Sequence, residues 1–318
     1  MSRWTRTLRA CRFGVRAVLL AALIGAASTP ALAAAKPGGH GGGGGTATTT
    51  GNDVSYPQCG STLPSAPAFA IVGLTGGLAN NLNPCFGPSS SYPSYTQSEL
   101  YGAASSATGV TVSQPKVSLY VNTADPGNVY NGTLIGDWPQ SSLTTDQYGS
   151  CLTTSVTLSS RTYTVGENSP ACAWQYGFNK AAQDAAWLAA AASAINDQQP
   201  QVTVNGSAGS YPWWLDVETA NTWQSNTAMN VADLQGMIAG LKAAGAATVG
   251  AYSTASQWDT VTGGTNSLSG SLYGIPEWLP GARTLSGAMA ACSQTPFTGG
   301  QITLTQWFSR PFDSDFAC

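Results

Sequence analysis

Apolar residues recur along this chain in short runs, separated by segments of helical or loop character. Six runs are rich in β-branched and aromatic residues, as strands are; they cover residues 52–56, 69–75, 117–123, 212–218, 248–253 and 303–308. Two intervening segments have helical signals: 174–195 is rich in alanine, and 231–243 follows Asn230 as a capping residue and stops at Gly245. Strands that alternate with helices pair in parallel, so the pattern predicts an α/β, TIM-barrel-like fold.

The segment 125–172 is too long for a plain connection between a strand and a helix. Polar and apolar residues alternate in its Ser/Thr-rich centre, as they do in a hairpin, and Cys151 and Cys172 are placed to close it. The segment follows the strand that ends at Thr123, so it should emerge at the carboxyl face of the barrel, where the active sites of barrels lie. We therefore expect an inserted, disulfide-closed flap that governs substrate range rather than folding.

The first 50 residues have the composition of an export segment and a tether. Five arginines precede an apolar run at 17–27, and Ala31-Leu32-Ala33 supplies a small-residue cleavage site. The run is too short for a membrane span, which needs about 20 residues, and residues 34–50 are dominated by glycine and threonine. The predicted organisation is a signal peptide at 1–33, a linker at 34–50 and one domain at 51–318.

Export also sets the expected state of the cysteines. We expect a secreted or extracellular protein, free or associated with a cell wall, without membrane contact once the signal peptide is removed. Six cysteines remain beyond residue 33, an even number in an oxidising compartment, and they allow 15 connectivities. Pairing of near neighbours closes the shortest loops, which favours Cys59 with Cys85, Cys151 with Cys172 and Cys292 with Cys318.

The charged residues exclude several classes of partner and mechanism. Beyond residue 33, seven basic residues stand against fifteen acidic ones, a formal net charge of about −8, which argues against binding to nucleic acid. The only histidine, His40, lies in the predicted linker, so neither a Ser-His-Asp or Cys-His system nor a typical catalytic zinc site is expected. We expect a monomer without metal or cofactor, in which carboxylates carry any acid-base chemistry.

Two carboxylates interrupt the apolar run 211–219, in a chain with only 8% charged residues. Asp216 and Glu218 are two positions apart, so on a strand they share a face and would both point into the barrel mouth. Two adjacent acids in a poorly solvated place cannot both ionise freely, so the pair retains a proton and one member can act as a general acid. A structural ion pair or a helix cap explains the same pattern equally well.

Two further acids are expected at the same rim of the barrel. Asp53 ends the first strand-like run, and Asp313 follows the last one, so both would lie at the carboxyl face. Each also has an ordinary explanation, as a turn aspartate or as part of a terminal tail.

Four landmarks occur in a distinctive order over most of residues 51–318. They are Asp53-Val-Ser55, Asp216-Val-Glu218, Val249-Gly-Ala-Tyr252-Ser253 with Trp258, and Gln306-Trp307 followed by Asp313. In type, order and spacing they resemble the landmarks of the family 25 glycoside hydrolases, the muramidases that cut bacterial cell-wall glycan. That family folds as a barrel of five β/α units and three further strands. The resemblance therefore implies a (β/α)5β3 variant of the barrel and a secreted glycosidase that cleaves β-1,4 linkages in peptidoglycan.

The resemblance also implies roles for the acids. Glu218 would be the general acid, and Asp216 would stabilise or orient the reacting acetamido group of the sugar. Substrate contacts would come from other landmark residues, and from one tryptophan that follows the central strand, because indole rings stack on sugars. These residues are Asp53, Tyr252, Gln306, Asp313 and Trp223.

Departures from the family pattern keep other functions open. The third strand carries Val121-Asn122-Thr123 where the family usually shows an aromatic-flanked histidine, and Trp307 stands where tyrosine is common. A non-catalytic cell-wall or glycan-binding protein on the same barrel is therefore one alternative. A hydrolase of another amino-sugar glycan, such as a chitin-like polymer, is the other.

Overall fold

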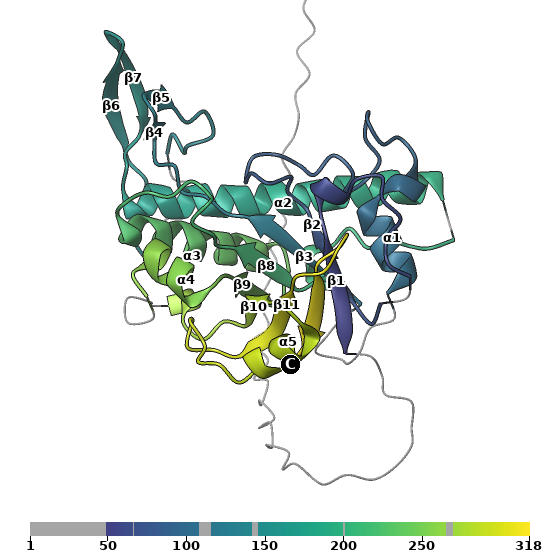
Figure 1. Cartoon of the computed structure of the whole chain (residues 1–318). Helices are drawn as coiled ribbons and strands as arrows, with labels where there is room; N and C mark the ends of the chain where they lie inside the picture. The colour runs from purple at the N-terminus through teal and green to yellow at the C-terminus, as the bar shows by residue number, and fades with distance from the viewer. Residues whose placement is uncertain (1–48, 66, 108–115, 142–145, 200, 265–269) are drawn as a thin grey trace, which may run out of the picture. The chain divides into compact units, whose positions relative to one another are not determined.

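The computed structural model describes residues 49–65, 67–107, 116–141, 146–199, 201–264 and 270–318 (Figure 1). The predicted signal peptide and nearly all of the predicted linker lie outside these residues, so both stay predictions. None of the described helices combines the length and the apolar composition that a membrane span needs.

Eight strands close a barrel at the centre of the described domain (Figure 1). They are β1 (Thr50–Val54), β2 (Ala70–Gly73), β3 (Val117–Asn122), β8 (Trp213–Asp216), β9 (Val249–Tyr252), β10 (Glu277–Ala282), β11 (Ile302–Trp307) and β12 (Ser314–Ala317). They neighbour one another in chain order, and β12 closes the barrel against β1. All neighbours are parallel except β12, which runs antiparallel to both β11 and β1. The predicted α/β barrel is confirmed.

Five α-helices lie between consecutive barrel strands from β2 to β11. In chain order they are α1 (Glu99–Ser106), α2 (Pro170–Gln198), α3 (Thr227–Ala243), α4 (Ala255–Thr262) and α5 (Leu285–Ala291). The described residues between β1 and β2 include the short helix η1 (Tyr56–Gln58) but no α-helix, and β11 leads directly to β12. The helices α2 and α3 pack so closely that a Cβ at Gly236 would lie 1.9 Å from the Trp174 carbonyl oxygen, which explains the glycine there.

The long helix α2 begins earlier than the alanine-rich pattern predicted. It starts at Pro170 behind Ser169, whose Oγ accepts the Cys172 N–H at 3.4 Å. Proline suits this position because the first turn of a helix leaves its N–H groups without partners. Cys172 therefore lies inside α2, and the insertion that was predicted to end at residue 172 ends at Ser169.

The start of α3 also corrects a sequence-based assignment. The helix begins at Thr227 and is capped by the Asn226 side chain, which accepts the Ala228 N–H at 3.1 Å. The prediction of Asn230 as the cap was wrong. Asn230 is buried within the helix, and its amide donates to the carbonyl oxygens of Gln224 and Val261, so tertiary contacts explain this asparagine.

Two barrel strands were not predicted. Pro280 and Gly281 interrupt β10, and both residue types are typical of turns rather than strands. The strand β12 has only four residues, two of them polar, and it pairs antiparallel to its neighbours. Asp313 therefore precedes the last strand, whereas the sequence pattern placed it after the last strand.

The barrel strands direct alternate side chains into two apolar layers. On β8, Trp213 and Leu215 belong to the layer beneath the helices, while Trp214 packs inside the barrel with Ile71 and Trp278. Alternate residues of a strand point the same way. Asp216 therefore continues the inner row at the carboxyl end of β8, which is the facing that the sequence predicted.

The insertion between β3 and α2 forms two hairpins. The first pairs β4 (Val129–Tyr130) with β5 (Thr133–Leu134), and the second pairs β6 (Thr153–Leu158) with β7 (Arg161–Gly166). Most residues of the second hairpin are exposed, and Figure 1 shows it projecting away from the helices. The hairpin expected in the Ser/Thr-rich centre is present.

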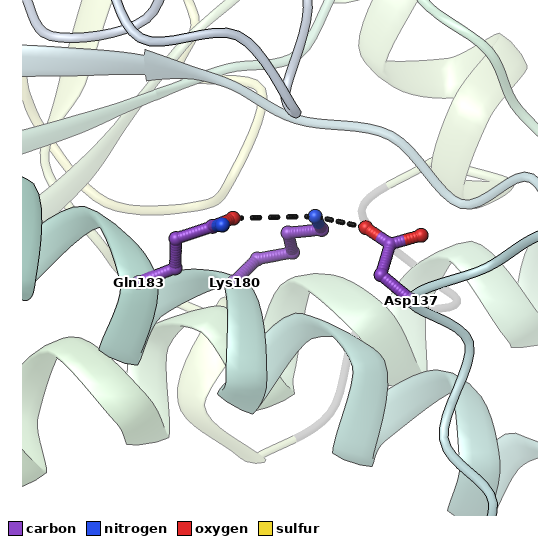
Figure 2. Close-up of polar contacts among 3 residues, drawn as sticks. All are labelled: Asp137, Lys180 and Gln183. Atoms are coloured by element: carbon purple, nitrogen blue, oxygen red, sulfur yellow. Dashed lines mark hydrogen bonds and ion pairs between the residues drawn. The ribbon is translucent and has the colours of Figure 1, made fainter.

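Residues 124–139, here called the insertion base, are fixed to α2. The Trp138 and Tyr176 rings stack with their centroids 5.3 Å apart. Lys180 Nζ forms an ion pair with the Asp137 carboxylate and donates to Gln183 Oε1 at 3.3 Å (Figure 2). The insertion base is therefore fixed to α2 through Asp137 and Trp138, while the β4–β5 hairpin within it stands beside the projecting β6–β7 hairpin (Figure 1).

Three disulfides join the six cysteines of the described domain. They link Cys59 with Cys85, Cys151 with Cys172, and Cys292 with Cys318. The near-neighbour pairing is confirmed.

Candidate active site

A cavity of about 250 Å³ lies where several barrel strands reach their carboxyl ends. We call it the acid pocket, because four carboxylates are among its lining residues. It brings together six of the residues predicted from the sequence: Asp53, Asp216, Glu218, Tyr252, Gln306 and Asp313. The other lining residues are Ser55, Tyr56, Pro57, Gln58, Gly77, Tyr120, Asn122 and Trp278.

The β3–β8 register sets the surroundings of Asp216. Asn122 is the residue paired with Asp216 across the two strands, and its Nδ2 donates to Asp216 Oδ2. Thr75 in turn fixes Asn122: its Oγ1 donates to Asn122 Oδ1 at 3.0 Å and accepts the Asn122 N–H at 2.7 Å. The Asp216 carboxylate is thus held by an oriented amide. Glu218, two residues further on, is partly exposed at the pocket wall.

Burial is the main reason that the pKa of Asp216 is raised well above its ordinary value. The charge of Glu218 raises it further, and the Asn122 hydrogen bond opposes the shift. The two acids therefore retain a proton at a pH where an isolated aspartate is ionised. The sequence pattern predicted that Glu218 carries this proton. In the structure, the burial of Asp216 favours Asp216 as the protonated member of the pair.

A second wall of the acid pocket is built around Asp53. Tyr252 donates its hydroxyl to Gln306 Oε1 at 3.0 Å, and Gln306 Nε2 donates to Asp53 Oδ2 at 2.9 Å, which connects β9, β11 and β1. Burial raises the pKa of Asp53 to about 6; the Gln306 hydrogen bond opposes this shift, and the Asp313 charge adds to it. This wall too keeps a proton in mildly acidic solution.

Asp315 is a buried acid next to this wall that was not predicted from the sequence. It is fully buried on β12, and its Oδ1 accepts the Trp278 Nε1–H at 2.8 Å. Burial raises its pKa well above the ordinary value, and the Asp53 charge raises it further. A signal was available, because Asp315 lies two residues from Asp313, but β12 was not recognised as a strand.

Aromatic rings form the floor and part of the rim. Trp278 contacts Tyr120, Trp214 and Tyr252 edge-on, with ring centroids 6.0, 6.1 and 4.5 Å away. Tyr56, from η1, lines the pocket and is 47% exposed. Rings of this kind present apolar faces on which the C–H face of a sugar can pack. Of the four aromatic residues that line the pocket, only Tyr252 was predicted.

Trp223 does not line the acid pocket. Its ring is half-buried against the core beneath the helices, and its Nε1–H donates to the carbonyl oxygen of Glu218 at 2.8 Å. The indole thus fixes the backbone that carries Glu218, and the substrate contact predicted for it finds no support in this cavity.

The lining residues suit an uncharged ligand. None of the described residues that line the acid pocket is a lysine, arginine or histidine, so an anionic group would meet the carboxylates there without a balancing positive charge. Among the described residues, the one cluster of three potential metal ligands consists of Cys59, Cys85 and Glu99, and its two cysteines form a disulfide. The chemistry that the pocket offers is proton transfer between carboxyl groups and a neutral polar ligand.

Comparisons with known proteins agree with the landmarks. A family model described as "Lysozyme-like protein 1" matches residues 191–273, which include β8, Glu218 and β9. Two proteins of Dictyostelium discoideum, named probable GH family 25 lysozyme 2 and probable GH family 25 lysozyme 4, are 47% and 43% identical to the chain over 51 residues. The resemblance to the family 25 glycoside hydrolases is confirmed.

The family 25 likeness is local in sequence. Each Dictyostelium alignment covers 16% of this chain, and the chain spans about a quarter (23%) of either relative. A bacterial lysozyme from Streptomyces coelicolor aligns over 86% of this chain and 93% of its own, at 17% identity and a TM-score of 0.39. A structural similarity at that TM-score adds nothing to the assignment of an activity.

Proposed function

We propose that this protein is a secreted glycoside hydrolase that cleaves β-1,4 linkages in an amino-sugar glycan, with cell-wall peptidoglycan as its natural substrate. The observation that carries the proposal is the pairing of a buried Asp216 with a partly exposed Glu218 in a pocket without basic residues. Such a pocket holds a proton near a neutral ligand, which is what hydrolysis of a glycosidic bond requires. The family 25 resemblance supports the same reaction class.

The acid pair has distinct parts in this reaction. Glu218 is the more exposed member, so it donates the proton to the oxygen of the leaving sugar as the bond to the anomeric carbon breaks. Asp216 accepts a hydrogen bond from the N–H of the acetamido group and orients its oxygen toward that carbon. Water then forms the new bond to the anomeric carbon, and the proton that this water loses returns to Glu218.

Ligand binding also resolves which acid carries the proton. A hydrogen-bond donor favours the ionised form of a carboxyl group. An acetamido N–H against Asp216 therefore stabilises the Asp216 carboxylate, and the proton of the pair moves to Glu218, where it is needed. The Asn122 amide acts in the same direction, because it already donates to Asp216.

Asn122 also favours a second candidate, a non-catalytic glycan-binding protein. It stands at the strand end where the family usually shows a histidine, and its contacts to Asp216 and Thr75 are those of a structural amide. A third candidate, hydrolysis of a different amino-sugar glycan, uses the same acids.

Release of reducing sugar from purified cell wall and from chitin-like oligomers tests these candidates. We expect wild-type protein to act on wall glycan. Activity on chitin-like polymers alone would point to the third candidate. Binding to walls without any release of sugar would contradict hydrolysis and support the binding protein.

A further inference from the structure

A second cavity, of about 160 Å³, lies at the insertion base. Four separate segments line it: the loop after β2, the insertion base itself, α2, and the loop after β8. We call it the insertion cavity, and its lining residues are Leu78, Ala79, Asn80, Ala124, Pro126, Tyr130, Ile135, Tyr176 and Thr222.

The insertion cavity and the acid pocket border the same two loops. After β2, Gly77 lines the acid pocket and the next residue, Leu78, lines the insertion cavity. After β8, Glu218 lines the acid pocket and Thr222 lines the insertion cavity. The Asp125 N–H donates to the Thr222 carbonyl oxygen at 2.9 Å, which ties the insertion to this loop. The two cavities are therefore lined by neighbouring residues of the same two loops, which is the arrangement that adjacent subsites for a chain-like ligand require.

The walls of the insertion cavity select the kind of group that can enter. None of its lining residues carries a charge at neutral pH, and most are aliphatic or aromatic. Leu78 and Tyr130 are 59% and 45% exposed, so two large apolar side chains stand in water at its rim. Asn80, Thr222 and the tyrosine hydroxyls supply a few polar groups. An aromatic ring beside a few polar groups fits a pyranose, which has an apolar C–H face and hydroxyls at its edge.

The insertion cavity is built on anchored residues. Tyr130 lies on β4, which pairs with β5 in a two-stranded hairpin. Asp125 accepts the Gly127 N–H at 3.1 Å and the Gln224 Nε2–H at 2.8 Å, which fixes the start of the insertion. The ion pair of Lys180 with Asp137 holds the far end of the base on α2 (Figure 2). These contacts hold both ends of the insertion base, which lowers the ordering cost of binding in the cavity.

We propose that the insertion cavity is a subsite for a further sugar unit of the same glycan strand, with Tyr130 as the ring on which that sugar packs. The inference rests on the proposed function and adds a requirement for chain length. The insertion then extends the substrate groove along the carboxyl face of the barrel, in place of covering the acid pocket as a flap.

Chain-length dependence tests the subsite. The probes are amino-sugar oligomers of increasing length, cut from purified wall glycan, and the measured quantity is the ratio of kcat/KM for long oligomers to kcat/KM for short ones. In Tyr130→Ala this ratio should fall about tenfold, which corresponds to about 1.4 kcal/mol of lost packing. Tyr130→Phe keeps the ring and should keep the ratio. Tyr163→Ala is the matched control, because Tyr163 is an exposed tyrosine on the projecting hairpin.

The outcomes separate this inference from the proposed function. Wild-type cleavage of short oligomers supports the function whatever the ratio does. A ratio that is unchanged in Tyr130→Ala, or that falls equally in Tyr163→Ala, overturns the subsite and leaves the function intact. If wild type cleaves nothing, the affinity for the same oligomers is measured by calorimetric titration. Equal affinity of wild type and Tyr130→Ala for long oligomers then overturns the subsite. Thermal unfolding of each variant shows whether it is folded.

Discussion

Two groups of buried carboxylates among the described residues have different surroundings, and the group in the barrel mouth lines the acid pocket. In the barrel mouth, Asp53 and Asp216 are buried at strand ends and line the acid pocket. Beside α2 and α3, the side chains of Asp125, Asp184 and Asp233 are buried as well. Burial raises the pKa of all five carboxyl groups.

The two regions differ in what surrounds the acids. Between the helices, Lys180 is buried, and its charge lowers the pKa of both Asp184 and Asp233, against the effect of burial. In the barrel mouth no basic residue lines the described walls, and amide side chains hold Asp53 and Asp216. A raised pKa is therefore not by itself the mark of a site for chemistry, because burial raises it in both regions. A site for chemistry also needs a cavity in which the retained proton can meet a ligand.

The largest expected effect is a loss of activity when an acid of the barrel mouth is replaced, compared with an acid between the helices. Glu218→Gln preserves the shape of the side chain and removes the transferable proton, so hydrolysis of wall glycan should fall by roughly 100-fold or more. The matched change between the helices, Asp184→Asn, should leave the rate per folded molecule within about twofold of wild type. Reducing-sugar release at equal folded concentration measures both. Full activity in Glu218→Gln would remove the general-acid assignment.

The free energy of unfolding should be more sensitive to a change between the helices than the activity is. Lys180→Met removes the charge that faces Asp184 and Asp233 and breaks the ion pair with Asp137, so the free energy of unfolding should fall by about 2 kcal/mol. Lys242→Met, at an exposed position of α3, is the control and should change it little. Denaturant titration measures the difference. Equal stability of the two variants would show that Lys180 adds nothing to the helix region.

The acid pocket should nevertheless affect stability through pH. Asp53 binds its proton more tightly in the folded protein, with a pKa of about 6 against 3.8 for the unfolded group. Its contribution is therefore complete below about pH 3.8 and is lost as the pH rises through about 6. Between pH 5 and pH 7 the loss is about 1 kcal/mol.

Asp53→Asn removes this titration, so the free energy of unfolding should depend less on pH over that interval. Asp197→Asn, at an exposed position near the end of α2, serves as the control. Denaturant midpoints at several pH values provide the measurement. An unchanged slope in Asp53→Asn would mean that Asp53 titrates alike in both states.

The smallest effect concerns the projecting hairpin. Replacing residues 155–164 by a two-residue turn removes exposed parts of β6 and β7 and leaves the disulfide and the docked base in place. The free energy of unfolding should change by less than about 0.5 kcal/mol. Thermal unfolding measures this. Loss of the cooperative transition would show that the hairpin belongs to the core of the domain.

The sequence could predict those parts of the site that depend on one strand at a time. Asp216 and Glu218 share a face because strand side chains alternate, and Asp53 reaches the pocket because strand ends meet at one rim of a barrel. Both expectations needed only local patterns and the fold class. The near-neighbour disulfides followed from loop lengths in the same way.

The parts that were missed depend on pairing between strands. Asn122 reaches Asp216 because of the β3–β8 register, which no local pattern contains. Trp278 and Asp315 lie on β10 and β12, the two strands without a clear strand signal. The insertion was predicted to emerge as a flap at the carboxyl face of the barrel, but its contacts to α2 became visible only in three dimensions. Its effect on substrate range stays a prediction.

The position of β12 has a consequence for biosynthesis. This strand hydrogen-bonds to β1 and β11, and with Asp313 before it and Asp315 on it, it supplies two acids at the barrel mouth. A ribosome-bound chain that stops before residue 313 thus has an open barrel and an unfinished pocket, however well its earlier helices have formed. Any chemistry of the acid pocket is therefore acquired late, once β12 has emerged and almost the whole described domain has been synthesised.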